Sequence, residues 1–250
     1  MFTLSEQSQP ILNVIKDSLK LYKLAFLALL PFTFFYTIFF IAPNVVLHTY
    51  IVFWKHNVMM QPKHYTHLLI LLQFIFGACV MVFFAGLIDQ CIHTANNAIR
   101  TQWQSFVIGI RKFPFVFIAT WFCLIFIMIG LVLFIIPGIY LSIALMFFPV
   151  FIVIENNGPW NAIKKSYELI RHHWWRTFVV MLPPFILQAA AAKIMELLFG
   201  HPILLPTIGH SIHDISTMGH ILLGISLLIT IPWTVTTLIC QYHDLKLRNK

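Results

Sequence analysis

The stretch Leu133–Phe178, LFIIPGIYLSIALMFFPVFIVIENNGPWNAIKKSYELIRHHWWRTF, decides how the rest of the chain is interpreted. It contains an apolar run, the pair Pro137-Gly138, a second apolar run that ends at Glu155, and a basic amphipathic segment. Proline and glycine interrupt helices and favour turns. The stretch therefore predicts two antiparallel helices joined by a tight turn at Pro137-Gly138, followed by a helix that lies on a surface.

The composition identifies the surroundings of these helices. Hydrophobic residues make up 60% of the 250 residues, charged residues 10%, and the mean hydropathy is +0.86. Soluble domains carry about 25% charged residues. So few charges cannot cover a water-facing surface, so we expect lipid around much of the chain. The four cysteines form no C-x-x-C pair, and we interpret them as small apolar residues rather than a disulfide framework.

The apolar runs predict an all-α bundle, a single integral membrane domain over residues 1–250. A helix rises 1.5 Å per residue, so about 20 apolar residues cross a hydrocarbon core of roughly 30 Å. Six runs reach or approach this length, and the fourth is the shortest because it turns back directly after the third. We place the six spans at about 24–46, 68–88, 115–136, 139–154, 175–198 and 219–240.

The segment from Pro159 to Trp174 is the clearest surface helix. Asn157 or Gly158 can cap it, and Pro159 suits its first position. Apolar residues recur at steps of three and four, which is typical of an amphipathic helix in the membrane interface. The alternative is a cytosolic bundle helix. The residues expected at the lipid interface are Trp160, Ile163, Lys164, Lys165, Arg171, Trp174 and Trp175.

Basic residues predict the orientation. With six spans, thirteen of the sixteen Lys and Arg residues fall on the side that carries both termini, and the positive-inside rule makes that side cytoplasmic. This topology already explains the net charge of +8, so nucleic-acid binding is not needed to explain it. The thirteen are Lys16, Lys20, Lys23, Arg100, Arg111, Lys112, Lys164, Lys165, Arg171, Arg176, Lys246, Arg248 and Lys250.

A short internal repeat is also present. Ile15–Lys23 (IKDSLKLYK) and Ile163–Arg171 (IKKSYELIR) share the pattern I-K-x-S-x-x-L-x-[KR], and both precede a predicted helical hairpin. The segment Gly109–Pro114 precedes the third and fourth spans in the same way. The chain can therefore be interpreted as three units, each a cytoplasmic elbow helix followed by a hairpin.

Three motifs give the chain a family resemblance. They are the PGIY motif at Pro137–Tyr140, the segment Glu155–Leu169 followed by two tryptophans, and the tail motif around Asp244. Together they resemble the YciC-like bacterial inner-membrane proteins, and the related membrane domain of some glycerophosphodiester phosphodiesterases. The tail has Lys246 where that family usually has Arg. The resemblance implies six spans, an inner-membrane location and structural roles for Pro137, Gly138, Tyr140, Glu155, Ser166 and Asp244, but no reaction.

Histidines are the conspicuous chemical resource. Eight of the twelve fall on or near the predicted outer side, including His64-x-x-His67 and His210-x-x-His213. Such spacings can place metal ligands on one helical face, but polar loop residues explain them as well. We therefore expect no metal, no cofactor and no catalytic residue. A metal-dependent membrane enzyme using these histidines is one alternative.

Carboxylates argue against ion-coupled transport. None of the eight falls in the middle of a predicted span, and Asp89 comes directly after the second. Ion-coupled transporters place ionisable groups at membrane depth. We therefore predict a non-enzymatic inner-membrane protein that acts in membrane or lipid organisation, with the bilayer, including anionic lipids, as partner. A transporter or flippase for a small or amphipathic substrate is the other alternative.

Overall fold

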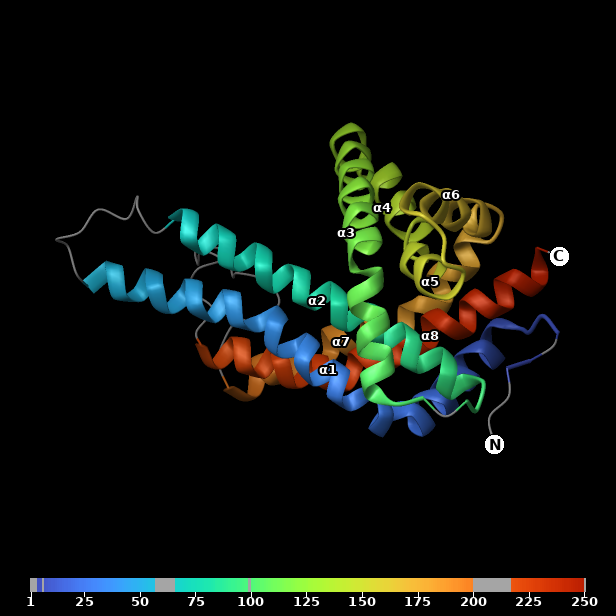
Figure 1. The fold of residues 1–250 in the computed structure, drawn as a ribbon, viewed down its shortest axis with the longest axis horizontal. Coiled ribbons are helices and arrows are strands. Elements are labelled where there is room, and N and C mark those ends of the chain that lie inside the picture. The colour runs from blue at the N-terminus through green and yellow to red at the C-terminus, as the bar shows by residue number, and fades with distance from the viewer. Residues whose placement is uncertain (1–3, 6, 57–65, 99, 200–216, 250) are drawn as a thin grey trace.

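The computed structural model describes residues 4–5, 7–56, 66–98, 100–199 and 217–249, and within these ranges the chain is helical without strands. Figure 1 shows how the helices are arranged. They are α1 (Ile11–His56), α2 (Thr66–Ala95), α3 (Gln102–Leu133), α4 (Ile135–Ala144), α5 (Phe148–Ile154), α6 (Pro159–Ile170), α7 (Trp174–Phe199) and α8 (Thr217–Arg248).

Six helical stretches are long and apolar enough to cross a membrane, which confirms the all-helical class and the six apolar segments. Outside the fourth span, the helices are longer than the predicted spans. The 46 residues of α1 extend roughly 69 Å at 1.5 Å per residue, more than twice the hydrocarbon core. The six stretches are Ile11–Pro43, Ile70–Ala95, Gln102–Leu133, Ile135–Ile154, Trp174–Ile194 and Gly219–Arg248.

The two other expected elbows are not separate helices. Residues 15–23 continue without a break into the rest of α1, and residues 109–114 lie inside α3. The repeat serines are nevertheless both fully buried. Ser18 donates to the Ile15 carbonyl and accepts from the Trp233 indole at 3.3 Å. The two matching segments thus have a buried serine in common. Because two of the three elbows are not separate helices, the threefold repeat stays a prediction.

The turn between the third and fourth spans lies at Phe134, so its predicted place at Pro137-Gly138 is wrong. Phe134 has extended backbone angles, with φ −160° and ψ 145°, and it separates α3 from α4. Pro137 instead lies in the first turn of α4, where a missing N–H breaks no intrahelical bond. Gly138 lies where α4 touches α3, because a Cβ there would come within 2.4 Å of the Leu131 side chain.

The fourth span is two helices rather than one. Residues 145–147 form a turn between α4 and α5. Ser166 of α6 binds both sides of this turn: its hydroxyl donates to the Ala144 carbonyl at 2.9 Å and accepts from the Phe147 N–H at 3.2 Å. A uniformly apolar run carries no signal for this break, because the residue that stabilises it lies in a later helix.

The second span also extends further than predicted, and it takes Asp89 with it. α2 continues to Ala95, so Asp89 lies inside the helix and is buried. Its carboxylate lies 3.0 Å from the guanidinium nitrogen Nε of Arg100, which also contacts the His93 ring through another nitrogen at 2.7 Å. The buried charge is therefore paired, as burial in a low-dielectric environment requires.

The two ends of the chain lie side by side. The Gln9 N–H donates to the Asp244 carboxylate at 2.7 Å, and Arg176 and Arg248 each bind both the Asp244 carboxylate and the Gln9 carbonyl. Asp244, one of the family-motif residues, thus joins the N-terminal segment to α7 and α8. Because both ends meet there, the number of complete membrane crossings must be even.

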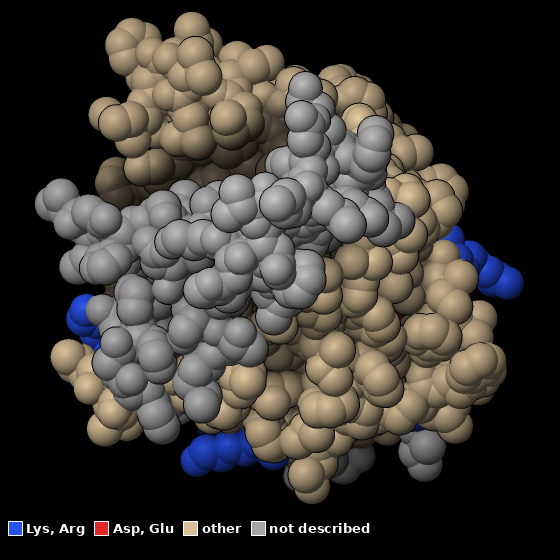
Figure 2. Space-filling model, turned by 90° about the vertical axis from the view of Figure 1, so that its left-hand side faces the viewer, with Lys and Arg blue, Asp and Glu red and all other residues tan. Residues whose placement is uncertain are grey.

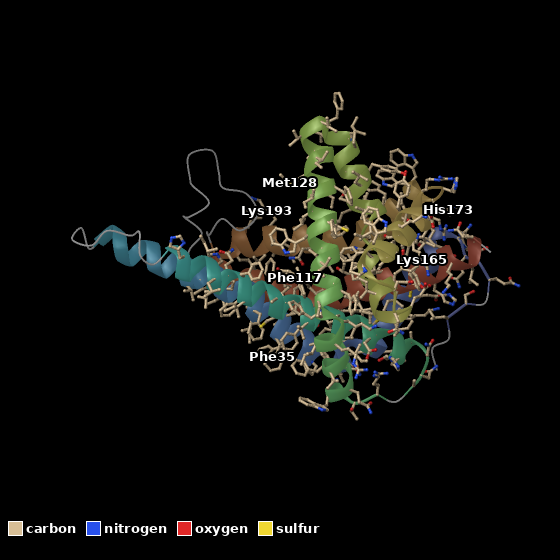
Figure 3. All side chains as sticks on the ribbon, turned by 45° about the horizontal axis from the view of Figure 1, so that its top comes forward. Phe35, Phe117, Met128, Lys165, His173 and Lys193 are labelled. Carbon is tan, nitrogen blue, oxygen red and sulfur yellow. The ribbon has the colours of Figure 1, made fainter. Side chains whose placement is uncertain are left out.

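Figures 1 and 3 show that the hairpins do not all point the same way. The pair α1 and α2 extends to the left in both views, whereas α3 and α4 rise away from it. Figure 2 looks at the left-hand end of the molecule, and the Lys and Arg side chains visible there lie only at its rim. Among the residues drawn in colour, no Lys or Arg side chain is visible in the middle of this face.

Candidate functional site

Helix α6 begins and faces as the periodicity predicts. Gly158 is its N-cap and Pro159 its first residue, while Asn157 donates from its side-chain amide to Glu155 at 3.1 Å. Ile163 and Ile170 are buried in the protein core, so this part of the predicted apolar face packs on the helical bundle. The helix ends at Ile170, and Trp174 begins α7 instead of ending the surface helix.

The predicted lipid-interface residues divide into separate groups. Trp160 is 58% exposed and packs beside α3. Lys164 lies 3.9 Å from Glu168, and both side chains face outward. Lys165 turns toward Glu155, at 2.9 Å. The basic residues of α6 therefore do not form one surface.

Glu155 is the centre of a polar cluster rather than a cap for α6. Its carboxylate accepts hydrogen bonds from Tyr242 at 2.6 Å, Lys246 at 2.8 Å and Lys165 at 2.9 Å. Burial alone would raise the pKa of this carboxyl, but the bonds from Lys246, Tyr242, Lys165 and Asn157 outweigh it and lower the pKa to about 2. Glu155 thus holds α6 and α8 together as a permanent anion.

A hollow between α4 and the start of α7 brings the remaining predicted residues together. Its volume is about 580 Å³, and we call it the Trp174 hollow. Tyr140, Arg171, Trp174 and Trp175 were predicted to have interface or family roles. The isoleucines and histidines of the lining were missed as members of a site, because the distance between α4 and the α6–α7 connection is not a local property. The full lining is Ile136, Ile139, Tyr140, Arg171, His172, His173, Trp174, Trp175 and Arg176.

Stacked aromatic rings form the wall of this hollow. The Trp174 ring lies 5.7 Å from Tyr140 and 5.6 Å from Phe178 in stacked geometry, and 4.7 Å from Trp175 edge to face. The Trp174 indole N–H donates to the Tyr140 carbonyl at 3.1 Å. These contacts fix the wall, and they leave Trp175 73% exposed at its edge. Rings that are apolar on one side and polar on the other are typical of the membrane interface.

The charges in the hollow are unequal. Arg176 is held by the Asp244 carboxylate at 2.7 Å, an anion that it shares with Arg248. Among the described residues, Arg171 has no carboxylate partner, and its guanidinium contacts only the His172 ring, at 3.1 Å. Burial lowers the pKa of His173, because it disfavours the charged ring. Arg248, Arg176 and His172 lower this pKa further, whereas the Asp244 carboxylate acts to raise it. Figure 3 labels His173 in the part of the molecule that holds α6.

This arrangement suits an anionic amphiphile. Arg171 supplies one uncompensated positive charge, and a guanidinium can bind two oxygens of a phosphate. Ile136 and Ile139 supply an apolar side, and Trp175 supplies an amphipathic edge. A headgroup and the first part of an acyl chain can therefore both find a partner in one hollow.

A second polar cluster lies within the apolar helices. Gln188 of α7 donates to the Ser226 hydroxyl at 3.2 Å and accepts from the Thr230 hydroxyl of α8. Ser226 and Thr230 are buried. Such bonds between membrane helices each contribute roughly 0.6–2 kcal/mol. The cluster is therefore explained as a contact that joins α7 to α8.

The metal hypothesis concerns residues that are mostly outside the described ranges. His64, His201, His210 and His213 all lie there. Within the residues that the structure describes, no three His, Cys, Asp or Glu side chains gather as metal ligands.

Comparison with known proteins gives one match. A family model described as a domain of unknown function (DUF7847) matches residues 55–242, which is most of the chain and includes α2 to α7. The comparison with curated proteins and the comparison with solved structures each gave no match.

Proposed function

We propose, from the premise that this chain belongs to the DUF7847 family, that it is a multi-pass inner-membrane protein that binds anionic lipid in the Trp174 hollow. It acts in membrane or lipid organisation and catalyses no reaction. The observation that carries this proposal is the hollow itself, because it combines an unpaired Arg171, a rigid aromatic wall and an apolar side.

The placement in the membrane is part of the proposal. The six long apolar helices support a multi-pass protein. The concentration of basic residues supports a cytoplasmic location for the joined termini and for α6. The resemblance to YciC-like proteins supports a bacterial inner membrane and structural roles for the motif residues. The threefold elbow-plus-hairpin repeat also stays a proposal, supported by the two matched buried serines.

Lipid mass spectrometry after mild-detergent purification tests this function. Arg171→Gln combined with Trp175→Ala removes the free charge and the exposed ring of the hollow. One basic residue contributes on the order of 1 kcal/mol to anionic-lipid attraction, so retention should fall about fivefold. Lys164→Gln is the matched control, because it removes an exposed charge of α6 outside the hollow. Equal retention of anionic lipid in the double variant and the control would contradict the proposal.

Transport is the second candidate. The Gln188–Ser226–Thr230 cluster joins α7 to α8, and it also favours transport, since polar residues inside apolar helices often mark a substrate path. Purified protein in vesicles that carry a fluorescent lipid would reveal flipping. A flipping rate above that of empty vesicles, lost in Gln188→Leu, would support lipid transport in place of lipid organisation.

Elemental analysis of untagged protein tests the metal alternative. One zinc or iron per chain, lost when His210 and His213 become Ala, would support it.

A further inference from the structure

The amphipathic helix α6 lies beside the half of the α3–α4 hairpin that contains the turn. The Trp160 ring lies 6.2 Å from the Phe122 ring and 6.3 Å from the Phe126 ring of α3. Further along α6, the Tyr167 ring lies 6.4 Å from the Tyr140 ring of α4. These rings belong to the part of the hairpin that a six-span topology places well inside the membrane.

The length of helix beyond these contacts is too short to reach the other membrane surface. Eight residues separate Phe126 from the turn at Phe134, which corresponds to about 12 Å at 1.5 Å per residue. The Trp160 ring of α6 lies 6.3 Å from the Phe126 ring, so only about two turns of helix separate this contact from the hairpin turn. The hydrocarbon core is roughly 30 Å thick. The turn therefore cannot lie at the surface opposite to α6, whatever the tilt of the hairpin.

The Trp174 hollow leads to the same placement through other residues. Ile136 and Ile139, which follow the hairpin turn, line the hollow together with Arg171 and Arg176. Arg176 is bound to Asp244 and Gln9 at the joined ends of the chain. The start of α4 thus lies beside the connection between α6 and α7.

The hairpin is also unusually apolar and uncovered. No charged residue occurs between Lys112 and Glu155. Around the turn, Val132 is 81%, Phe134 74% and Ile136 79% exposed. A contiguous apolar patch of this kind marks a contact with lipid or protein. Acyl chains are the cover that fits, because the exposed Lys164, Lys165 and Glu168 keep the neighbouring α6 at the membrane–water boundary.

We propose that the α3–α4 hairpin does not cross the bilayer, and that it inserts into the cytoplasmic leaflet beside α6. Four helices then cross completely: α1, α2, α7 and α8. The different direction of the hairpin in Figures 1 and 3 agrees with this arrangement. The inference rests on the proposed cytoplasmic position of α6. Four crossings and six crossings place both termini on the same side, so the distribution of basic residues does not distinguish them.

Cysteine labelling of the full chain tests the position of the turn. The native cysteines at 79, 91, 123 and 240 are first replaced by alanine, and Phe134→Cys is added. In right-side-out membrane vesicles, a membrane-impermeant maleimide should label Phe134→Cys no more than it labels the cysteine-free protein. Lys63→Cys, predicted outside, is the positive control. Labelling of Phe134→Cys as strong as that of Lys63→Cys would overturn the inference.

Cross-linking makes the test independent of how deeply the turn is buried. Ile136→Cys and Trp175→Cys line one hollow, so a short dimaleimide should join them, whereas Ile136→Cys with Lys63→Cys should give no product. Absence of the first product overturns the inference. Arg171→Cys reports the side on which α6 lies. If it is labelled from outside while the cross-link forms, the cytoplasmic placement fails but the non-crossing hairpin stands.

Discussion

At the scale of single residues, the structure assigns definite partners to the side chains that the family resemblance singled out. Ser166 binds both sides of the α4–α5 turn, Asp244 binds both arginines, and Glu155 joins α6 to α8. Each of these residues joins two different parts of the chain. The motif residues therefore hold the helices that surround the Trp174 hollow, and the hollow itself is lined mostly by other residues.

Glu155→Gln should destabilise the protein by roughly 1–3 kcal/mol at neutral pH, because it leaves Lys165 and Lys246 without their shared anion. The folded-state pKa of about 2 is below the ordinary value of 4.5, so this stabilisation is complete above pH 4.5 and disappears as the pH falls through about 2. Thermal unfolding in detergent at pH 7 and pH 3 measures both effects. Glu168→Gln is the control, because the ion pair between Glu168 and Lys164 is exposed and 3.9 Å long. Equal midpoints for the two variants at pH 7 would contradict the role of Glu155.

At the scale of elements, two contacts decide how the central stretch packs. α4 approaches α3 at Gly138 and Gly130, where the Cβ of residue 130 would lie 3.0 Å from the Cα of Gly138. α6 packs Ile163 and Ile170 into the core and leaves Lys164 in contact with solvent. A single substitution should disrupt each contact, and a substitution at a nearby exposed position serves as its control.

Gly138→Val should separate α4 from α3, because even its Cβ would overlap the Leu131 side chain at 2.4 Å. Overpacking of this kind costs roughly 1–3 kcal/mol. Gly158→Ala is the control, since a Cβ at Gly158 meets nothing within 4 Å and its φ of −68° suits any residue. Thermal midpoints in detergent compare the two. A midpoint for Gly138→Val that matches Gly158→Ala would show that the two helices are not in close contact.

Ile163→Asp should reduce the folded yield much more than Lys164→Asp. The first change removes roughly 1.5–3 kcal/mol of apolar burial and adds the cost of placing a charge in the core. The second changes a side chain that is 68% exposed. Size-exclusion chromatography of the detergent extracts measures the monodisperse fraction. A similar loss in both variants would mean that α6 does not pack through Ile163.

At the scale of the whole molecule, the joined termini make the number of crossings even, and the basic residues predict which side they occupy. The proposed hairpin in one leaflet changes the number from six to four without changing the location of any long connection. Composition alone favours six spans because the helices of the hairpin are long and apolar whether or not they cross the membrane.

Reporter fusions after Lys63 and His210 should be active outside, and fusions after Lys112, Arg171 and Lys250 should be active in the cytoplasm. The reason is that basic residues resist transfer across the membrane, and they gather near the last three positions. Paired reporters, one active only outside and one only inside, measure each site. A reporter after Lys250 that is active outside would contradict the proposed orientation.

Sequence alone determined the features that depend on neighbouring residues. Long apolar runs require helices in lipid, and the Gly158-Pro159 pair with apolar steps of three and four fixed the start and the inner face of α6. Tertiary structure decided what depends on residues far apart in the chain. Proline fits both a turn and the first turn of a helix, so only the packing of Gly138 on α3 placed the turn at Phe134. The bond from Tyr242 to Glu155 joins residues 87 positions apart, and no local pattern encodes such a distance. The Trp174 hollow likewise exists because α4 meets the start of α7, a contact that periodicity cannot reveal.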